Sequence, residues 1–335
     1  MGLCGKKSAY AIVRGLKNRS LMLYEYFPNV VFLANPKDDP RDLMDYTACV
    51  SCVEFFKEMH EEWFAETFFL FTWVKNESAI KDVNTKQYNR KILLWLAEEE
   101  RGFLPIGLSD YTVIFKNHLR EQPSGNKILP LPLFTPLDSL PSKDVPFKER
   151  ELNLFFSGNL NINRLDLYYQ LNDNKSWLEK LIYKVRRIRG GFRLFTYYYK
   201  DKTFDFSNLF EKSFVRFNNG FHSGLSPEEY AAKTSHSKIV LSPKGFYTSE
   251  CFRLYEAMHA GCIVITEILP QLSFYKDIPV VQVDSWKDVQ KLVNNLLADE
   301  SKLENISDNA VEFYEEHLSV RAISEYVYKY SNGPV

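Results

Sequence analysis

Short apolar runs alternate with longer segments in which apolar residues recur every three or four positions. The runs predict strands, and in the first half they fall near Val30–Ala34, Phe68–Val74, Ile92–Leu96, Thr112–Phe115 and Ile128–Pro130. Helical spacing of apolar residues fills Arg41–Glu66. Strands that alternate with helices predict a parallel sheet covered on both faces.

The second half repeats this alternation. Strands are predicted at Leu152–Asn159 and in the runs "FVRFNNG", "KIVLS", "CIVIT" and "PVVQV". Helices are predicted from Asn163, over Lys175–Arg189, after Ser226, over Ser249–Ala260, from Ser285 to about Ala298, over Lys302–His317 and over Ser319–Tyr330. The start after Ser226 is the best marked, because Ser226 and Glu229 form a capping box and Pro227 stands at the first helical position. The charges of Lys175–Arg189 are interpreted as a solvated helix face.

Proline separates the two halves. Five prolines punctuate the stretch that ends near Glu151, at positions 130, 132, 136, 141 and 146. Because proline fixes φ and removes a hydrogen-bond donor, this stretch is predicted to be an extended linker. We place the boundary at about residues 135–150, between a first Rossmann-like domain over 1–140 and a second over 150–335.

Composition narrows the function. The 335 residues carry a net charge of −1, which gives no argument for nucleic acid as a partner. No apolar run approaches the roughly 18 residues of a membrane span. The five cysteines are scattered, and Cys49-x-x-Cys52 has no second pair, so reduced thiols in the cytosol are expected rather than a metal or redox site.

The stretch "KIVLSPKGFYTSECFRLYEAMHAGCIVIT" places a glycine-bearing loop and a helix start between two buried strands. In an open α/β sheet, ligands bind at the carboxyl ends of strands, where helix N-termini suit phosphate. Gly245 allows close approach of the backbone, and Arg253 and Glu256 share a helix face. The Glu256 carboxylate can accept hydrogen bonds from the hydroxyls of a ribose, and Arg253 beside it can bind a phosphate oxygen. The alternative is a plain turn followed by a surface ion pair.

This stretch resembles the C-terminal signature of the exostosin-like glycosyltransferases. The matching residues are Ser242, Pro243, Gly245, Arg253, Glu256, Ala257, Ala260, Gly261 and Cys262. The likeness is close over about 30 residues and looser from Leu152 to Val283. The first half has no matching motif, and Val264 stands where the family usually has proline.

The resemblance implies a GT-B fold, in which two Rossmann-like domains face each other across a cleft. The first domain would bind the acceptor and the second a nucleotide sugar, usually with UDP. The donor-binding residues that it implies are Ser157, Gly158, Asn159, Arg164, Asn219, His222, Ser242, Lys244, Gly245, Glu250, Arg253 and Glu256. Retaining GT-B enzymes often carry two glutamates eight positions apart, but Thr248 stands eight before Glu256, with Glu250 nearer. Inversion is therefore expected.

Inverting transfer needs a general base and a stabilised leaving diphosphate. Glu98 follows the run Ile92–Leu96 and is the expected base, with Asp45 and His60 as further candidates. No Asp-x-Asp triplet suits a metal, so arginines are expected to stabilise the diphosphate, with no metal and no cofactor besides the co-substrate.

Three questions stay open on these residues. The donor is expected to carry UDP, but a GDP-sugar transferase of the fucosyl type remains an alternative, as does a protein that binds nucleotide sugars without catalysis. The acceptor is expected to be a glycan or lipid-linked glycan of a surface polysaccharide. The chain is expected in the cytosol or in peripheral contact with the inner face of a membrane.

Overall fold

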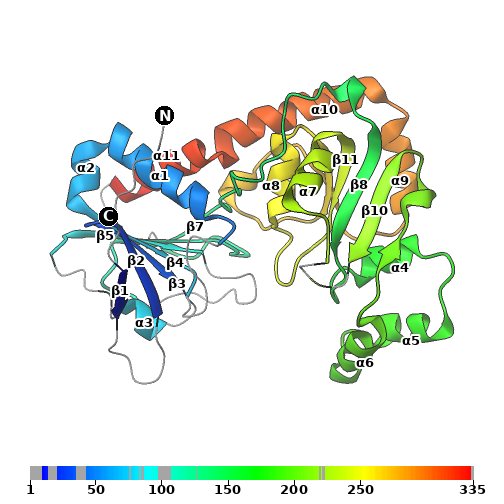
Figure 1. Ribbon diagram of the computed structural model, residues 1–335, viewed down its shortest axis with the longest axis horizontal. Coiled ribbons are helices and arrows are strands. Elements are labelled where there is room, and N and C mark those ends of the chain that lie inside the picture. Colours follow the sequence, from blue (N-terminus) through cyan, green and yellow to red (C-terminus); the bar gives the residue numbers. More distant parts are fainter. Residues whose placement is uncertain are drawn as a thin grey trace. The chain divides into compact units, whose positions relative to one another are not determined.

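The computed structural model describes residues 10–13, 21–34, 43–74, 77–81, 83, 87–96, 107–125, 127–218, 220 and 223–332. The chain divides into two compact units (Figure 1). The first unit comprises Met1–Asp138, Leu272–Phe274 and His317–Val335, and the second comprises Ser139–Gln271 and Tyr275–Glu316.

The first unit is built on a seven-stranded sheet. Its strands follow the order β1 (Tyr10–Val13), β2 (Leu21–Phe27), β3 (Val30–Ala34), β4 (Thr67–Thr72), β5 (Arg90–Trp95), β6 (Val113–Lys116) and β7 (Ile128–Pro130). β1 to β3 pair antiparallel, and β3 to β7 pair parallel. The five predicted strands of this half are the five parallel ones, whereas β1 and β2 were not predicted.

Alternation along these strands divides the core of the first unit into two layers. One face carries Phe32, Phe71 and Leu94 and packs against α1 (Tyr46–Met59), α2 (Glu61–Glu66) and α11 (Val320–Asn332). The opposite face carries Leu33, Leu70 and Trp95 and packs against α3 (Glu77–Lys81) and the segment around Leu108. Both faces are buried, as a parallel sheet requires.

The second unit holds a six-stranded sheet in the order β13-β12-β11-β8-β10-β9. Its strands are β8 (Leu152–Asn159), β9 (Phe204–Asp205), β10 (Ser213–Asn218), β11 (Ser237–Ser242), β12 (Ile263–Glu267) and β13 (Val281–Val283). Its α-helices are α4 (Leu165–Leu171), α5 (Trp177–Val185), α6 (Arg189–Tyr199), α7 (Pro227–Ser235), α8 (Phe252–His259), α9 (Val289–Leu297) and α10 (Glu300–Phe313). Short 3-10 turns lie at Phe147–Glu149, Ser207–Leu209 and Ser273–Tyr275, and a π-helical turn at Tyr314–Leu318 follows α10. Only β9 pairs antiparallel within this sheet. The expected α/β fold with two Rossmann-like sheets is confirmed.

Some predicted boundaries were wrong. Arg41–Glu66 is two helices where described, because the backbone leaves helical geometry at His60. The helix predicted over Ser249–Ala260 begins only at Phe252. Asp288, in a left-handed conformation, occupies the N-cap position predicted for Ser285. The helix predicted from Asn163 begins at Leu165, and Lys175–Arg189 is α5 followed by the start of α6.

The division of the chain also differs from the predicted 1–140 and 150–335 at the C-terminus. The first unit ends at Asp138, within two residues of the predicted boundary, but it regains the chain from His317 onwards. The physical reason is burial, because Ile323 and Val327 of α11 are fully buried in the core of the first unit. No helix in the described ranges is long and apolar enough to cross a membrane.

Candidate functional site

The strand order of the second unit creates a switch point between β8 and β11. The chain leaves β8 for β10 on one side and returns to β11 on the other, so that β8 and β11 are neighbours. Ligands of open α/β sheets bind at such a point, beyond the carboxyl ends of the strands. Ser157–Asn159 end β8, and Ser242 ends β11. Two predicted segments far apart in sequence therefore meet at one edge.

Two arginines converge at Gly158. Arg253 Nη2 donates to the Ser157 carbonyl oxygen at 2.8 Å, and Arg164 Nη1 donates to the Asn159 carbonyl oxygen at 2.9 Å. A Cβ atom on Gly158 would lie 2.9 Å from Arg253 Nη2 and 3.2 Å from Arg164 Nη1. Glycine thus leaves room for both guanidinium groups over one stretch of backbone. Two like charges held this close favour a bound anion.

Arg253 keeps unused donors. Its Nε and Nη1 atoms are buried and form no hydrogen bond of ordinary geometry among the described residues, although the Tyr230 hydroxyl interacts with the guanidinium. Burial lowers the pKa of Arg253, but the negative charge that Tyr230, Cys251 and Glu256 can carry outweighs it, so that the pKa lies above its usual value. The guanidinium stays charged at neutral pH. Buried donors without partners cost free energy, which oxygen atoms of a ligand would recover.

Glu256 follows Arg253 by one turn on α8. Its side chain is largely buried, with 6% relative exposure. Burial raises the pKa of its carboxyl group to about 7, although the charge of Arg253 opposes the rise. No described residue donates a hydrogen bond to this carboxylate. A carboxylate in this state gains free energy from ligand hydroxyls that donate to it.

The loop between β11 and α8 is held in place by residues that the sequence did not single out. Glu267 Oε2, at the end of β12, accepts from the Lys244 backbone N–H at 2.7 Å. Asn163 Nδ2 donates to the carbonyl oxygens of Gly245 at 2.7 Å and Phe246 at 2.8 Å. Glu267 directly follows a predicted strand and Asn163 lies in the loop after another, which is the signal that could have indicated them.

Two other predicted donor residues contact the protein interior. Ser242 Oγ lies 3.1 Å from Cys251 Sγ. Glu250 is fully buried, and Oε1 accepts a hydrogen bond from the Tyr275 hydroxyl at 2.6 Å. These side chains therefore support the loop and the start of α8. Asn219 and His222 lie outside the described residues.

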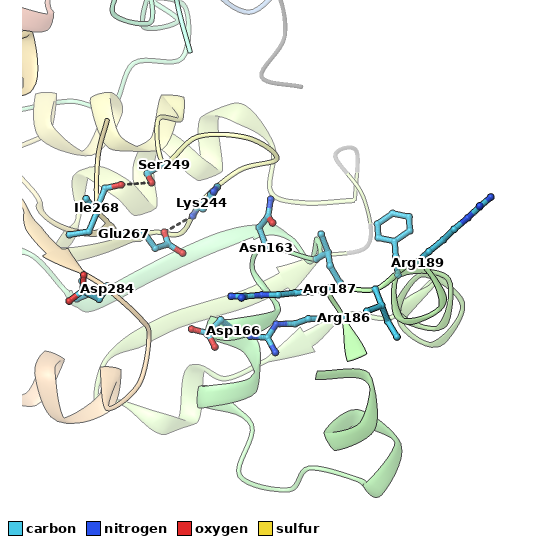
Figure 2. A pocket seen from close by; sticks show the side chains of 14 residues that line it. Asn163, Asp166, Arg186, Arg187, Arg189, Lys244, Ser249, Glu267, Ile268 and Asp284 are labelled. Atoms are coloured by element: carbon cyan, nitrogen blue, oxygen red, sulfur yellow. Dashed lines mark hydrogen bonds between the residues drawn. The ribbon is translucent and has the colours of Figure 1, made fainter. Parts of the chain in front are cut away.

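A pocket of about 670 Å³ lies at the same edge of the sheet, and Lys244 in its wall accepts a hydrogen bond from Arg164 Nε through its carbonyl oxygen. The loop contributes Lys244 and Ser249, β12 contributes Glu267, and the turn between α5 and α6 contributes Arg186 and Arg187 (Figure 2). Gly158, Arg164, Arg253 and Glu256 are not among its lining residues. The predicted donor residues therefore gather next to this pocket, and Lys244 is common to both.

The candidate bases of the first unit lie in different places. Asp45 precedes α1, is buried, and accepts a hydrogen bond from Trp73 Nε1 at 3.0 Å. Burial raises its pKa to about 6, although its hydrogen bonds and His118 lower it. Trp73 directly follows β4, so Asp45 lies at the carboxyl edge of this sheet, where active sites of α/β proteins form.

His60 lies at the opposite end of α1. Fourteen residues of helix separate it from Asp45, a length of roughly 20 Å. Its ring stacks on Tyr328 of α11, with 3.4 Å between the ring centroids. His60 is thus packed between helices, away from the carboxyl edge of the sheet. Glu98 lies outside the described residues, and the described ranges contain no group of three or more metal-ligating side chains suited to a metal ion.

Residues 175–327 match a protein family described as "Glycosyl transferase-like". The match covers somewhat less than half of the chain. It includes Lys244, Arg253 and Glu256 but begins after Gly158 and Arg164. The match supports a glycosyltransferase-like domain and does not confirm the exostosin-like family that the motif suggested. No curated protein sequence matches this chain.

Solved structures that match this chain at low sequence identity include a sucrose-phosphate synthase and a glycosyltransferase. A sucrose-phosphate synthase from Thermosynechococcus elongatus has a TM-score of 0.45 at 14% identity, over 92% of this chain and 84% of that one. AviGT4, a glycosyltransferase involved in avilamycin A biosynthesis, scores 0.42 at 11% identity, over 87% and 89%. Anabaena HepE in complex with UDP scores 0.42 at 10% identity, over 84% and 80%.

Proposed function

We propose that this protein is a glycosyltransferase that moves a sugar from a nucleotide sugar to a glycan acceptor. The observation that carries the proposal is the pair Arg164 and Arg253, which converge at Gly158 on the switch point of the second sheet. Glu256 adds an unpartnered carboxylate one turn beyond Arg253. The match of residues 175–327 to a transferase family supports the same function.

Each group has a role in this proposal. Arg164 and Arg253 bind the donor diphosphate and stabilise the charge that builds up on it as the sugar leaves. Glu256 accepts hydrogen bonds from the ribose hydroxyls. The loop that Asn163 and Glu267 hold brings the Gly245 backbone to the donor. Transfer is inverting in this proposal, because Thr248 stands where retaining enzymes carry the second glutamate. It is independent of metal, because the arginines supply the positive charge that a metal would otherwise supply.

The acceptor hydroxyl must lose its proton to a general base. Glu98 remains the proposed base. Asp45, which lies among the residues that the structure describes, is the alternative. The raised pKa of Asp45, about 6, suits a group that takes up a proton near neutral pH. Glu98→Gln and Asp45→Asn, compared in one transfer assay, separate the two, because loss of the base lowers turnover by roughly 10²–10⁴-fold while donor binding stays intact.

Nucleotide binding tests the donor site directly. Titration calorimetry with UDP and GDP is expected to show tighter binding of UDP, by analogy with the exostosin-like enzymes. Arg253→Lys keeps the charge but loses the planar fork, and it should weaken UDP binding by at least about tenfold. Arg216→Lys is the matched control, because Arg216 forms an exposed ion pair with Asp205.

The other outcomes are also informative. Tighter binding of GDP would replace UDP by a GDP-sugar donor of the fucosyl type. Tight UDP binding without transfer to any glycan acceptor would indicate a sensor or inactive partner on the same fold. An unchanged affinity in folded Arg253→Lys would remove the arginine pair from the donor site, and the proposal with it.

The acceptor is proposed to be a glycan or lipid-linked glycan of a surface polysaccharide, extended in the cytosol at the inner face of a membrane. The cysteines support this proposal, because Cys49, Cys52, Cys251 and Cys262 form no disulfide among the described residues. Cell fractionation that recovers a secreted, disulfide-linked protein would contradict it.

A further inference from the structure

The helical hairpin α5–α6 differs in charge from the rest of the chain. Residues 175–202 contain nine lysines and arginines against two acidic residues, a net charge of +7, whereas the whole chain carries −1. The basic residues are Lys175, Lys180, Lys184, Arg186, Arg187, Arg189, Arg193, Lys200 and Lys202. The remainder of the protein is therefore net acidic, and the positive charge is concentrated on one supersecondary motif.

The same hairpin exposes large apolar side chains. Among the described residues, ten large hydrophobic side chains are exposed, and five of these lie between positions 177 and 197. They are Trp177, Leu181, Ile188, Phe192 and Tyr197. Trp177 is 75% exposed and Tyr197 is 84% exposed. Scattered exposed residues are ordinary, but such a concentration indicates a binding surface.

On each helix, the basic and apolar residues form one stripe. In α5, Trp177, Lys180, Leu181 and Lys184 are exposed at helical spacing, while Ile182 is buried in the core. In α6, the exposed positions follow the same spacing at Arg189, Phe192, Arg193, Tyr197 and Lys200. The opposite side of α6 is fixed by Phe195 and Tyr199, which pack in the core of the second unit.

We propose that this hairpin docks the protein on an anionic lipid bilayer. Exposed tryptophan and tyrosine suit the interfacial region of a membrane, and flanking lysines and arginines suit acidic headgroups. A second copy of the chain is disfavoured as the occupant, because two surfaces of +7 would repel each other. A nucleic acid would satisfy the charge but would leave the aliphatic Leu181 and Ile188 exposed to water.

The pocket connects this surface to the candidate site. Arg186, Arg187, Ile188 and Phe192 belong both to the hairpin and to the pocket wall. In Figure 2, Arg186 and Arg187 extend from the hairpin towards Asp166 across the pocket. A hairpin seated on a bilayer therefore brings the pocket, with Lys244 of the donor loop in its wall, to the lipid surface. A membrane-borne acceptor is the substrate class that this arrangement favours.

Trp177 supplies a site-specific test. The other four tryptophans, Trp63, Trp73, Trp95 and Trp286, are buried. Vesicles of phosphatidylcholine with about 30% phosphatidylglycerol should bind the protein, and brominated acyl chains should then quench Trp177. Trp177→Phe should bind the same vesicles without this quenching. Neutral phosphatidylcholine vesicles and anionic vesicles at high salt should bind weakly.

Charge reversal provides the matched comparison. Each basic residue near an anionic bilayer raises partitioning onto it by a factor of roughly five. The triple variant Lys180→Glu, Lys184→Glu and Arg193→Glu should therefore lower partitioning onto the anionic vesicles at least about 100-fold. The control reverses three lysines elsewhere on the second unit, Lys276, Lys287 and Lys291, all exposed. This control changes the net charge by the same amount, and it should lower partitioning onto the vesicles much less.

Three results would overturn the proposal. The first is equal partitioning of the hairpin variant and the control. The second is bound protein without quenching of Trp177. The third is tight, salt-sensitive binding to single-stranded nucleic acid together with no vesicle binding. Vesicle binding is measured without substrate, so its failure would leave the proposed transferase activity standing.

Discussion

Burial of the Glu256 carboxylate lowers the stability of the fold when this group is ionised. Its pKa is raised from 4.5 to about 7, so the folded protein holds this proton more tightly than the unfolded chain does. The stability that this tighter proton binding confers is complete below about pH 4.5 and is lost as the pH rises through 7. Above pH 7 the ionised group costs about 3 kcal/mol. A ligand that donates hydrogen bonds to the carboxylate would offset this cost.

Replacing Glu256 by Gln should therefore separate stability from binding. We expect Glu256→Gln to match the parent protein near pH 4.5 and to exceed its free energy of unfolding by up to about 3 kcal/mol at pH 8. UDP affinity should fall at least about tenfold, because an amide accepts less strongly than a carboxylate. Urea unfolding at the two pH values and calorimetry measure the two effects.

Glu312→Gln serves as the control, since Glu312 is exposed on α10. It should change neither the pH dependence of unfolding nor UDP affinity. A stability gain for Glu256→Gln without loss of affinity would mean that the carboxylate is buried for another reason and does not contact the nucleotide.

At the scale of elements, α8 is fixed at its end by Arg150. The Arg150 guanidinium donates to the carbonyl oxygens of Ala260 at 2.6 Å and Gly261 at 2.7 Å. These carbonyls end the helix and have no partner within it, so the cation satisfies them and complements the helix dipole. Since α8 carries Arg253 and Glu256, Arg150 positions both from the linker side without contacting the site.

Gly261 is the residue that this arrangement depends on. Its φ is +69°, and a Cβ atom would lie 3.0 Å from both Ser307 Oγ and Val311 Cγ2 and 3.1 Å from Arg150 Nη2. Gly261→Ala should lower the free energy of unfolding by about 1–3 kcal/mol, through backbone strain and crowding. Thermal and urea unfolding measure this loss.

The same substitution at Gly190 serves as the comparison, because a side chain there has room. Gly190 lies in α6, and a Cβ atom there would meet no atom within 4 Å apart from its chain neighbours and the backbone of its own helix. Gly190→Ala should be neutral or stabilise the protein by up to about 1 kcal/mol. Equal losses in the two variants would show that the left-handed backbone and the contacts at Gly261 have no energetic effect.

Local sequence signals predicted elements only where the decisive interaction is local. The capping box of Ser226 and Glu229 is present, and Gly261 is left-handed, because both depend on neighbouring residues. The start of α8 was placed too early because Ser249 donates to the Ile268 carbonyl oxygen, a contact 19 residues away. α6 was missed because adjacent glycines at 190 and 191 indicate a break, whereas packing of Phe195 and Tyr199 stabilises it.

In the candidate site, too, the sequence predicted only those residues whose arrangement is local. Arg253 and Glu256 were predicted from one motif because they share a helix face. Asn163 and Glu267 were not, since their partners Gly245 and Lys244 lie 82 and 23 residues away and only the strand order brings them together. The solvated face expected for Lys175–Arg189 is likewise exposed in the fold, but its turn also lines the pocket.

At the scale of the whole molecule, the second unit is inserted into the first. Apart from the short segment Leu272–Phe274, the chain leaves the first unit after Asp138 and returns to it at His317. Ile323→Ala in α11 should lower the stability of the first unit by about 2–5 kcal/mol, because Ile323 is fully buried. UDP binding, which the proposal assigns to the second unit, should persist wherever that unit stays folded.

Arg321→Ala is the control on the same helix, since Arg321 is exposed. Hydrogen exchange resolved along the chain should show faster exchange in β3–β7 for Ile323→Ala and no change for Arg321→Ala. Faster exchange confined to the second unit would contradict the assignment of α11 to the core of the first.

The return of α11 to the first unit has a consequence for biosynthesis. Domains of a nascent chain generally fold in the order in which they leave the ribosome. Here the residues of the second unit are complete at Glu316, whereas the first unit still lacks α11 at that point. The later half is thus able to reach its native packing before the earlier half. During that interval the buried face of β3–β7 has no α11 to cover it, and this is the stage at which a chaperone would be most needed.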